Sequence, residues 1–311
     1  MRLKITILYV LLFTTNLFVY AQDLPKVVNG KIERLSMFQS KYVTARNIDI
    51  WLPDGYSPSK KYAVLYMHDG QMLYDADASW NKQAWEVDEV AALLMKEGRV
   101  RDFIVVGIWN GGHTRHVDYF PQIPFESLTK KQQDSLYLAL RNNGNPVFNS
   151  LVVNSDSYLR FIVTELKPYI DSNFSTLTSP ENTFIAGSSM GGLISAYAIC
   201  QYPGVFGGAI CMSTHWPGTF SLENNPIPDA FFQYFSTHMP NPATHKIYFD
   251  YGDQTLDAMY PPLQKRIDDM MPANGFQQGK SWITQFFPGK DHSEKAWRER
   301  LHIPLLFMMG N

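Results

Sequence analysis

Short, almost uninterrupted apolar runs recur along the chain, separated by segments whose apolar residues repeat every three or four positions. Such a run is typical of a parallel strand covered on both faces, and such a repeat is typical of a helix with one buried face. The predicted central strands are Tyr62–Met67, Phe103–Trp109, a run starting at Thr183, Val205–Met212, Lys246–Tyr251 and Trp282–Phe287. The predicted helices are Trp85–Met95, Asp156–Asp171, the stretch from Leu193 to Cys200, Leu263–Met271 and a segment from Ser293. This alternation predicts an α/β fold with a mostly parallel central sheet and helices on both faces.

Two regions depart from that pattern. Lys31–Phe38 and Ala45–Leu52 alternate apolar and polar residues, which predicts antiparallel strands at the N-terminal edge of the sheet. Between residues 121 and 154 the periodicity fades, apart from a short polar-faced helix predicted at Lys130–Arg141. An insertion of this length is either a cover over an active site or a surface excursion, and the pattern leaves both open.

The first 21 residues have the composition of a targeting segment. Arg2 and Lys4 precede a short apolar run from Ile5 to Val19, and small Ala21 ends the segment. This arrangement is typical of a secretory signal peptide, and the run is at the short end for a membrane span. We therefore predict a signal peptide over residues 1–21 and a single domain over 22–311. The mature protein would be periplasmic or secreted, without stable membrane insertion.

Charge and cysteine content exclude some partners. The chain has 27 Lys and Arg against 29 Asp and Glu, a formal net charge of −2, and no concentrated basic segment. This argues against binding to nucleic acid or to an anionic membrane surface. The two cysteines, Cys200 and Cys211, fall in apolar segments and are predicted to be small buried hydrophobes; a disulfide between them is left open.

The run from Thr183 ends in a Gly-x-Ser-x-Gly sequence directly before a predicted helix. Gly187 and Gly191 flank Ser189 at this junction. A serine in such a strand-to-helix turn is the nucleophile elbow of an α/β-hydrolase fold. The glycines are expected there because a Cβ at either position would push strand and helix apart. Ser189 is the predicted nucleophile.

A nucleophilic serine needs a histidine to accept its proton and a carboxylate to orient that histidine. In α/β-hydrolases the chain order is serine, acid, histidine. His292 directly follows the last predicted strand and is the predicted general base. Asp253 and Asp257 both follow the strand Lys246–Tyr251; Asp257 is preferred because it lies further out, and Asp253 is the alternative. Asp250 belongs to the strand itself, so it is the least able to reach the histidine.

Ester hydrolysis also needs backbone N–H groups directed at the developing oxyanion. One is expected from Met190, directly after the nucleophile, and the other from Gln71, in the loop after the first central strand. Five further side chains are candidates for contact with the substrate: His68, Trp109, Arg115, His215 and Trp216.

With these pieces placed, the chain resembles the esterase D-like, or putative esterase, family of α/β-hydrolases, which includes feruloyl and acetylxylan esterases and enterochelin esterases. The resemblance rests on Val64–Gln71, Val105–Asn110, Arg115, Glu165–Asp171, Gly187–Gly192 and the pair Asp291-His292. It implies a Ser–Asp–His ester hydrolase without a metal or organic cofactor. Ser189, His292, Gln71 and Met190 match the family's motifs and carry these roles over.

These observations predict an exported serine carboxylesterase that forms an acyl-enzyme on a small-molecule or glycan ester, such as an acetyl or feruloyl ester of a carbohydrate. Export favours the carbohydrate, as do three aromatic residues expected near the site, because aromatic rings stack on sugars; they are Trp109, Trp216 and Tyr260. A siderophore esterase would need the same triad and a cationic pocket, for which Arg115 and Lys82 are the candidates. An acyltransferase, or a binding protein on the same scaffold, are the remaining alternatives.

Overall fold

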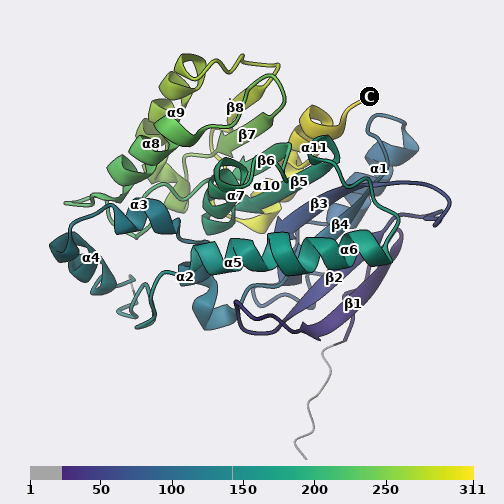
Figure 1. Cartoon of the computed structure of the whole chain (residues 1–311), viewed down its shortest axis with the longest axis horizontal. Helices are drawn as coiled ribbons and strands as arrows, with labels where there is room; N and C mark the ends of the chain where they lie inside the picture. Colours follow the sequence, from purple (N-terminus) through teal and green to yellow (C-terminus); the bar gives the residue numbers. More distant parts are fainter. Residues whose placement is uncertain (1–22, 142) are drawn as a thin grey trace, which may run out of the picture.

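A twisted central sheet organises the computed structural model, which describes residues 23–141 and 143–311 (Figure 1). The predicted signal peptide lies outside the described residues. The eight strands have the order β1-β2-β4-β3-β5-β6-β7-β8. The strands are β1 (Lys31–Phe38), β2 (Arg46–Leu52), β3 (Ala63–His68), β4 (Phe103–Ile108), β5 (Thr183–Ser188), β6 (Gly208–Met212), β7 (Lys246–Tyr251) and β8 (Trp282–Phe286). Strands β3 to β8 pair in parallel, whereas β1 and β2 are antiparallel, as predicted for this edge.

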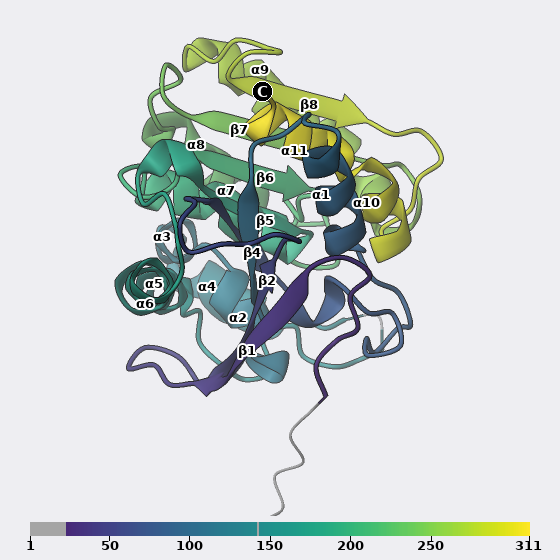
Figure 2. The same cartoon turned by 90° about the vertical axis from the view of Figure 1, so that its right-hand side faces the viewer.

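Helices cover both faces of the sheet (Figure 2). One face carries α5 (Ser155–Phe161), a π-helical turn (Ile162–Leu166), α6 (Lys167–Asn173), α7 (Met190–Gln201), α8 (Ile227–His238) and α9 (Pro261–Ala273). The other face carries α1 (Val87–Lys96), α10 (Glu294–Arg300) and α11 (His302–Met309). Successive strand residues point to opposite faces; in β3, for example, Tyr66 joins the first core and Leu65 the second. This explains why the central strands are apolar without interruption.

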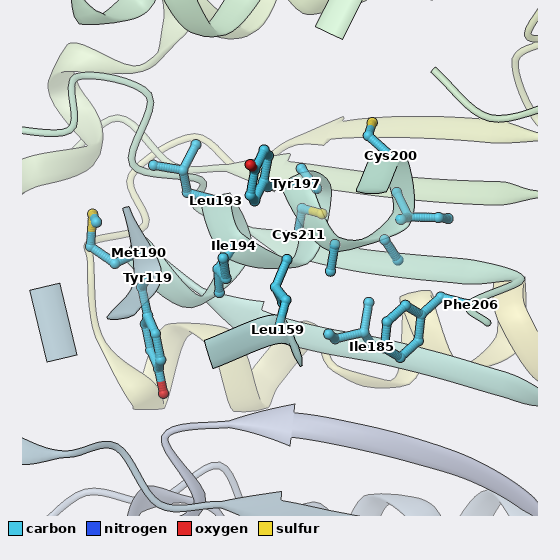
Figure 3. Close-up of a cluster of buried hydrophobic side chains, with 14 of the residues drawn as sticks. Tyr119, Leu159, Ile185, Met190, Leu193, Ile194, Tyr197, Cys200, Phe206 and Cys211 are labelled. Atoms are coloured by element: carbon cyan, nitrogen blue, oxygen red, sulfur yellow. The ribbon is translucent and has the colours of Figure 1, made fainter. Parts of the chain in front are cut away.

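Helix α7 lies in the centre of the larger core and holds the start of the site in place. Figure 3 shows its Leu193, Ile194 and Tyr197 packed near Ile185 of β5. Nearly every residue of the helix is buried, so its apolar residues are not confined to one side. Cys200 and Cys211 both lie in this core as free thiols, which settles the open question of a disulfide between them.

The insertion between residues 121 and 154 packs into the main core. It holds α3 (Gln122–Glu126) and α4 (Lys130–Tyr137), after the short helix α2 (Arg115–Tyr119). Phe125 and Phe148 are buried against Phe120, which in turn contacts Phe231 of α8 at 5.4 Å between ring centroids. The insertion therefore extends the core towards α8.

Most predicted elements are present, but the short helices α2 and α3 were not predicted, and a π-helical turn interrupts the helix predicted at Asp156–Asp171. The strand predicted at Val205–Met212 begins only at Gly208. The predicted helix at Lys130–Arg141 ends earlier, at Tyr137. Helix α8 was not predicted, although its buried Ile227, Ala230, Phe231, Tyr234 and Phe235 follow the helical spacing i, i+3, i+4, i+7 and i+8. No helix in the part of the chain that the structure describes is long and apolar enough to cross a bilayer.

Candidate active site

The turn between β5 and α7 holds Ser189 in a strained backbone conformation. Its φ is 57° and its ψ −123°, which is rarely adopted by a residue with a side chain and is typical of a nucleophile elbow. A Cβ on Gly187 would lie 2.7 Å from the backbone of Gly191, so glycine is required there. A Cβ on Gly191 would make only ordinary contacts, at 3.4 Å, with Asp69 and His68. The expected crowding therefore applies to Gly187, and Gly191 supplies the backbone that comes close.

The structure pairs His292 with Asp257 rather than with Asp253. His292 Nδ1 lies 2.6 Å from Asp257 Oδ1, and the Asp257 carboxylate is fully buried. Burial raises the pKa of Asp257, but hydrogen bonds from His292, Ser213 and the Gly252 N–H outweigh it, so the pKa lies below its ordinary value. Asp253 is partly exposed and accepts a hydrogen bond from the Gly289 N–H at 2.8 Å, which is the role of a turn residue.

The loops after β7 and β8 touch at Gly252, and this contact brings the acid to the histidine. A Cβ on Gly252 would lie 2.1 Å from the carbonyl oxygen of Lys290. The same carbonyl accepts hydrogen bonds from the N–H groups of Asp253 and Gln254, both at 3.1 Å. The His292 N–H donates to Thr255 Oγ1 at 3.0 Å. Because parallel strands end at one edge of the sheet, these loops meet there.

Ser189 and His292 line one cavity of about 370 Å³ at the carboxyl ends of the strands. The rest of its lining is Asp69, Gln71, Met72, Trp80, Asn81, Trp85, Asn110, Arg115, Ser188, Glu294 and Trp297. Gln71 lines the same cavity as Ser189, and Met190 is the first residue of α7, where backbone N–H groups have no partner within the helix. A larger cavity of about 460 Å³, beside Lys60 and Asp102, lies at the opposite ends of β3 and β4 and lacks a serine–histidine pair.

A second, partly buried carboxylate, Asp69, lines the same cavity as Ser189. Asp69 accepts two hydrogen bonds from Arg115, at 2.6 and 2.7 Å, and one from Asn110 Nδ2 at 2.6 Å. Burial raises the pKa of Asp69, but the guanidinium of Arg115 outweighs it, so the pKa lies below its ordinary value. Gly70, the next residue, has no room for a Cβ, which would lie 2.6 Å from the backbone of Gly107. This packing fixes the loop that carries Gln71.

Three of the residues predicted to contact the substrate lie outside the cavity lining. His68 is buried, with Nδ1 2.8 Å from the Tyr158 hydroxyl. Trp109 donates from Nε1 to Asp49 at 2.8 Å. Trp216 is 1% exposed and donates from Nε1 to Gln264 at 2.9 Å. Each follows a central strand, but its side chain satisfies a structural hydrogen bond away from the nucleophile.

The remaining two predicted contact residues lie close to the nucleophile. Arg115 lines the cavity. His215 is buried behind it, with Nδ1 2.8 Å from the hydroxyl of Tyr260, and that hydroxyl also hydrogen-bonds with the side chain of Ser189. Burial lowers the pKa of His215 to about 3, as it does for His68, so both imidazoles are neutral at pH 7.

Several residues of the site were not selected from the sequence. Trp80, Glu294 and Trp297 line the cavity. Ser213 Oγ donates to the Asp257 carboxylate at 2.6 Å, and Trp297 Nε1 donates to Ser213 Oγ at 3.0 Å. Ser213 follows β6 directly, so its position after a central strand was the available signal. Among residues 23–141 and 143–311, no group of three or more His, Cys, Asp or Glu is arranged to hold a metal ion.

Comparisons with known proteins bear on the same site. A family described as "Putative esterase" matches residues 41–307. The endo-1,4-β-xylanase/feruloyl esterase of Xylanibacter ruminicola is 24% identical over 65% of this chain and 24% of its own length. An uncharacterized Bacillus subtilis protein is 22% identical over 60% of this chain and 63% of its own length. The chain thus spans less than two thirds of these relatives.

Solved structures show the same fold at low sequence identity. A ferulic acid esterase from Anaeromyces mucronatus, solved with ferulic acid, is 19% identical and has a TM-score of 0.60, covering 90% of this chain and 92% of that one. The enterobactin esterase of Shigella flexneri is 14% identical, also with a TM-score of 0.60, covering 91% of this chain and 60% of that one. With the family match spanning residues 41–307 and the sheet of an α/β-hydrolase, the chain belongs to the putative esterase family.

Proposed function

We propose that this protein is an exported serine carboxylesterase that acts through an acyl-enzyme on acyl esters of carbohydrates. The observation that carries the chemistry is the pairing of His292 with a buried carboxylate, at 2.6 Å, in the cavity that also exposes Ser189. The export part rests on the sequence of residues 1–21 alone.

The geometry supports the following order of steps. His292 accepts the proton of the Ser189 hydroxyl as Ser189 Oγ attacks the acyl carbon, and Asp257 stabilises the imidazolium that forms. The N–H groups of Met190 and Gln71 stabilise the oxyanion of the tetrahedral intermediate. His292 then gives its proton to the departing alcohol, which leaves the acyl-enzyme. Water, activated by the same histidine, releases the acid and restores the serine.

The charges in the cavity favour a neutral, polar substrate. Arg115 is engaged in two hydrogen bonds to Asp69, and Glu294 adds a further carboxylate to the lining. Lys82, the other candidate cation, donates to the carbonyl of Asp77 and is absent from the lining. An anionic siderophore would lack an unpaired cation here, whereas a carbohydrate ester suits a lining rich in amide and carboxylate groups. Two similar proteins are named as feruloyl or ferulic acid esterases, which is consistent with this choice.

The release of p-nitrophenol from its acetate and butyrate esters tests the proposal. We expect turnover by the mature protein and a fall of at least about 1,000-fold in kcat for Ser189→Ala and for His292→Ala. His302→Ala is the matched control, because His302 is exposed at the start of α11, and it should retain full activity. Equal rates for all four proteins would show that the elbow is not catalytic. If an added sugar instead accelerates the breakdown of the acyl-enzyme and becomes acylated itself, the protein is an acyltransferase.

A further inference from the structure

The cavity mouth carries an exposed tryptophan. The side chain of Trp80 is 82% exposed and lines the same cavity as Ser189 and His292. All seven tryptophans lie in the described residues, and the other six are buried or partly buried. An indole in water does not gain the free energy that burial of its large apolar surface would give. Its position at the mouth of the candidate active site therefore points to a ligand that covers it.

The loop that presents Trp80 is tied to the helix that follows the catalytic histidine. Asn81 Nδ2 donates to Glu294 Oε2 at 2.8 Å, and Glu294 is the first residue of α10. Asn81 Oδ1 accepts from the Gln83 N–H at 3.1 Å and from Ser79 Oγ at 3.3 Å. These hydrogen bonds fix the loop next to Trp80 and so keep the residue beside the site.

We propose that Trp80 is the platform for the sugar ring of the alcohol that leaves the ester, which deepens, and rests on, the proposed function. A sugar ring combines an apolar C–H face with several hydroxyls. Trp80 supplies a flat apolar surface, and Glu294 and Asn110 in the same lining supply hydrogen-bond partners for hydroxyls. Because the indole faces solvent, a longer glycan can continue past it, while the acyl group stays at the serine.

Two esters of the same acid separate this role from a contact with the acyl group. For an arabinosyl ferulate we expect Trp80→Ala to lower kcat/KM about tenfold or more, and for methyl ferulate to change it less than twofold; Trp80→Phe should fall between. Phe286→Ala is the control, because Phe286 is 48% exposed and does not line the cavity. An equal loss on both esters, or none on either, would overturn the proposal. Calorimetry with xylo-oligosaccharides and the Ser189→Ala protein measures binding without turnover, so it is independent of the test of esterase activity. In this background Trp80→Ala should abolish binding. Retained binding would contradict the role of Trp80 as a platform.

A different observation concerns Ser213, which connects the triad acid to a buried cation. Ser213 Oγ lies 2.6 Å from Asp257 Oδ2. It also accepts hydrogen bonds from Arg300 Nη2, at 2.9 Å, and from Trp297 Nε1, at 3.0 Å. Arg300 in turn donates to the fully buried Asp250 at 2.8 and 3.1 Å. All five side chains are buried.

The donors around Ser213 leave one place for its proton. A guanidinium and an indole N–H can only donate, so they occupy both lone pairs of the hydroxyl oxygen. The hydroxyl hydrogen must then point at Asp257, which accepts. The Ser213 N–H, which donates to Asp250 Oδ1 at 3.1 Å, fixes the backbone of the same residue.

The geometry points to Ser213 as a positioning residue that Arg300 orients and that keeps Asp257 ionised and directed at His292. A carboxylate that loses this donor attracts the imidazolium proton more strongly. The acidic limb of the pH profile of kcat/KM must then move to higher pH when the hydroxyl is removed.

Ser213→Ala tests this with a readout that a purely structural role would leave unchanged. We expect kcat/KM at its optimum to fall about tenfold and the acidic limb to move up by about half a pH unit or more, with Arg300→Lys moving it less than Arg300→Met. The matched control is Arg46→Met, which breaks another buried ion pair, with Asp118 at 3.1 Å. It should lower the Tm and leave the limb in place. If Ser213→Ala lowers the Tm without moving the limb, the positioning role is refuted.

Discussion

Two carboxylates, the buried Asp257 and the partly buried Asp69, flank the candidate nucleophile Ser189, and their partners differ. The hydrogen-bond partners of Asp257, after β7, carry no permanent charge; they are Ser213, the Gly252 N–H and His292. Asp69, after β3, is bound on both oxygens by the guanidinium of Arg115. In both, hydrogen bonding and charge outweigh burial and keep the pKa below its ordinary value.

We interpret this difference in partners as the difference between a catalytic carboxylate, Asp257, and a structural carboxylate, Asp69. Arg115 permanently balances the negative charge of Asp69. The Asp69 carboxylate therefore stabilises the turn that carries Gln71 and can do little to stabilise a positive charge that forms during the reaction. In the mechanism that we propose, Asp257 meets a full positive charge only when His292 takes a proton, which is the moment at which the transition state needs it. A carboxylate at a candidate active site should therefore be interpreted by its partners, since the direction of the pKa shift is the same for both here.

The largest expected effect separates the two candidate acids. We predict that Asp257→Asn lowers kcat about 1,000- to 10,000-fold, because an amide can hold the wrong tautomer of the histidine and cannot stabilise the imidazolium. Asp253→Asn, at the exposed turn, should stay within twofold of the wild type. Steady-state kinetics with p-nitrophenyl acetate measure both. Comparable losses in the two variants would contradict the assignment.

A smaller, different effect is expected on the Arg115 side. Asp69→Asn leaves the guanidinium of Arg115 partly buried without its counter-charge, so we predict a loss of about 1–3 kcal/mol in the free energy of unfolding and a 10- to 100-fold fall in kcat/KM. The double variant Asp69→Asn/Arg115→Met should recover part of the stability, which a double-mutant cycle by urea unfolding will show. An additive loss in the double variant would mean that the pair does not act as a unit.

Acid should destabilise the protein through two buried histidines, His68 and His215. Burial lowers the pKa of His68 and of His215 to about 3, so the stability they contribute is complete above an unfolded-state pKa near 6.5 and is lost as the pH falls from 6.5 towards 3. Each contributes a slope of up to about 1.4 kcal/mol per pH unit in that window. In His68→Gln the difference in unfolding free energy between pH 7 and pH 5 should shrink by about 1–2 kcal/mol. An unchanged difference would show that His68 is not buried in the neutral form.

The smallest effect is expected at Tyr260. Its hydroxyl hydrogen-bonds with the Ser189 side chain and lies 2.8 Å from His215, so Tyr260→Phe removes a group that orients the nucleophile without touching the Asp257–His292 pair. We predict a two- to tenfold fall in kcat with little change in Tm. A faster variant would show that the tyrosine competes with His292 for the serine hydroxyl.

Local pattern was sufficient for the strands, most helices and the elbow. The apolar runs of β3 to β8, the two glycines around Ser189 and the position of His292 after the last strand are visible within short windows of sequence. Helix α8 was not predicted, although its buried residues have the helical spacing. The choice between Asp257 and Asp253 needed the contact of Gly252 with Lys290, two residues that are far apart in the chain.

The sequence by itself determined the architecture and the strand-to-helix turn that carries the candidate nucleophile, because β-strand burial, helix periodicity and the steric demand of the turn at Gly187 are local properties. Only the tertiary structure decided which polar groups meet. Ser213 and Arg300 are 87 positions apart, Trp109 and Trp216 turned to structural hydrogen bonds, and Trp80 was left exposed at the mouth of the cavity. Such contacts depend on where loops from different strands meet, and the local pattern of the sequence does not show which loops meet.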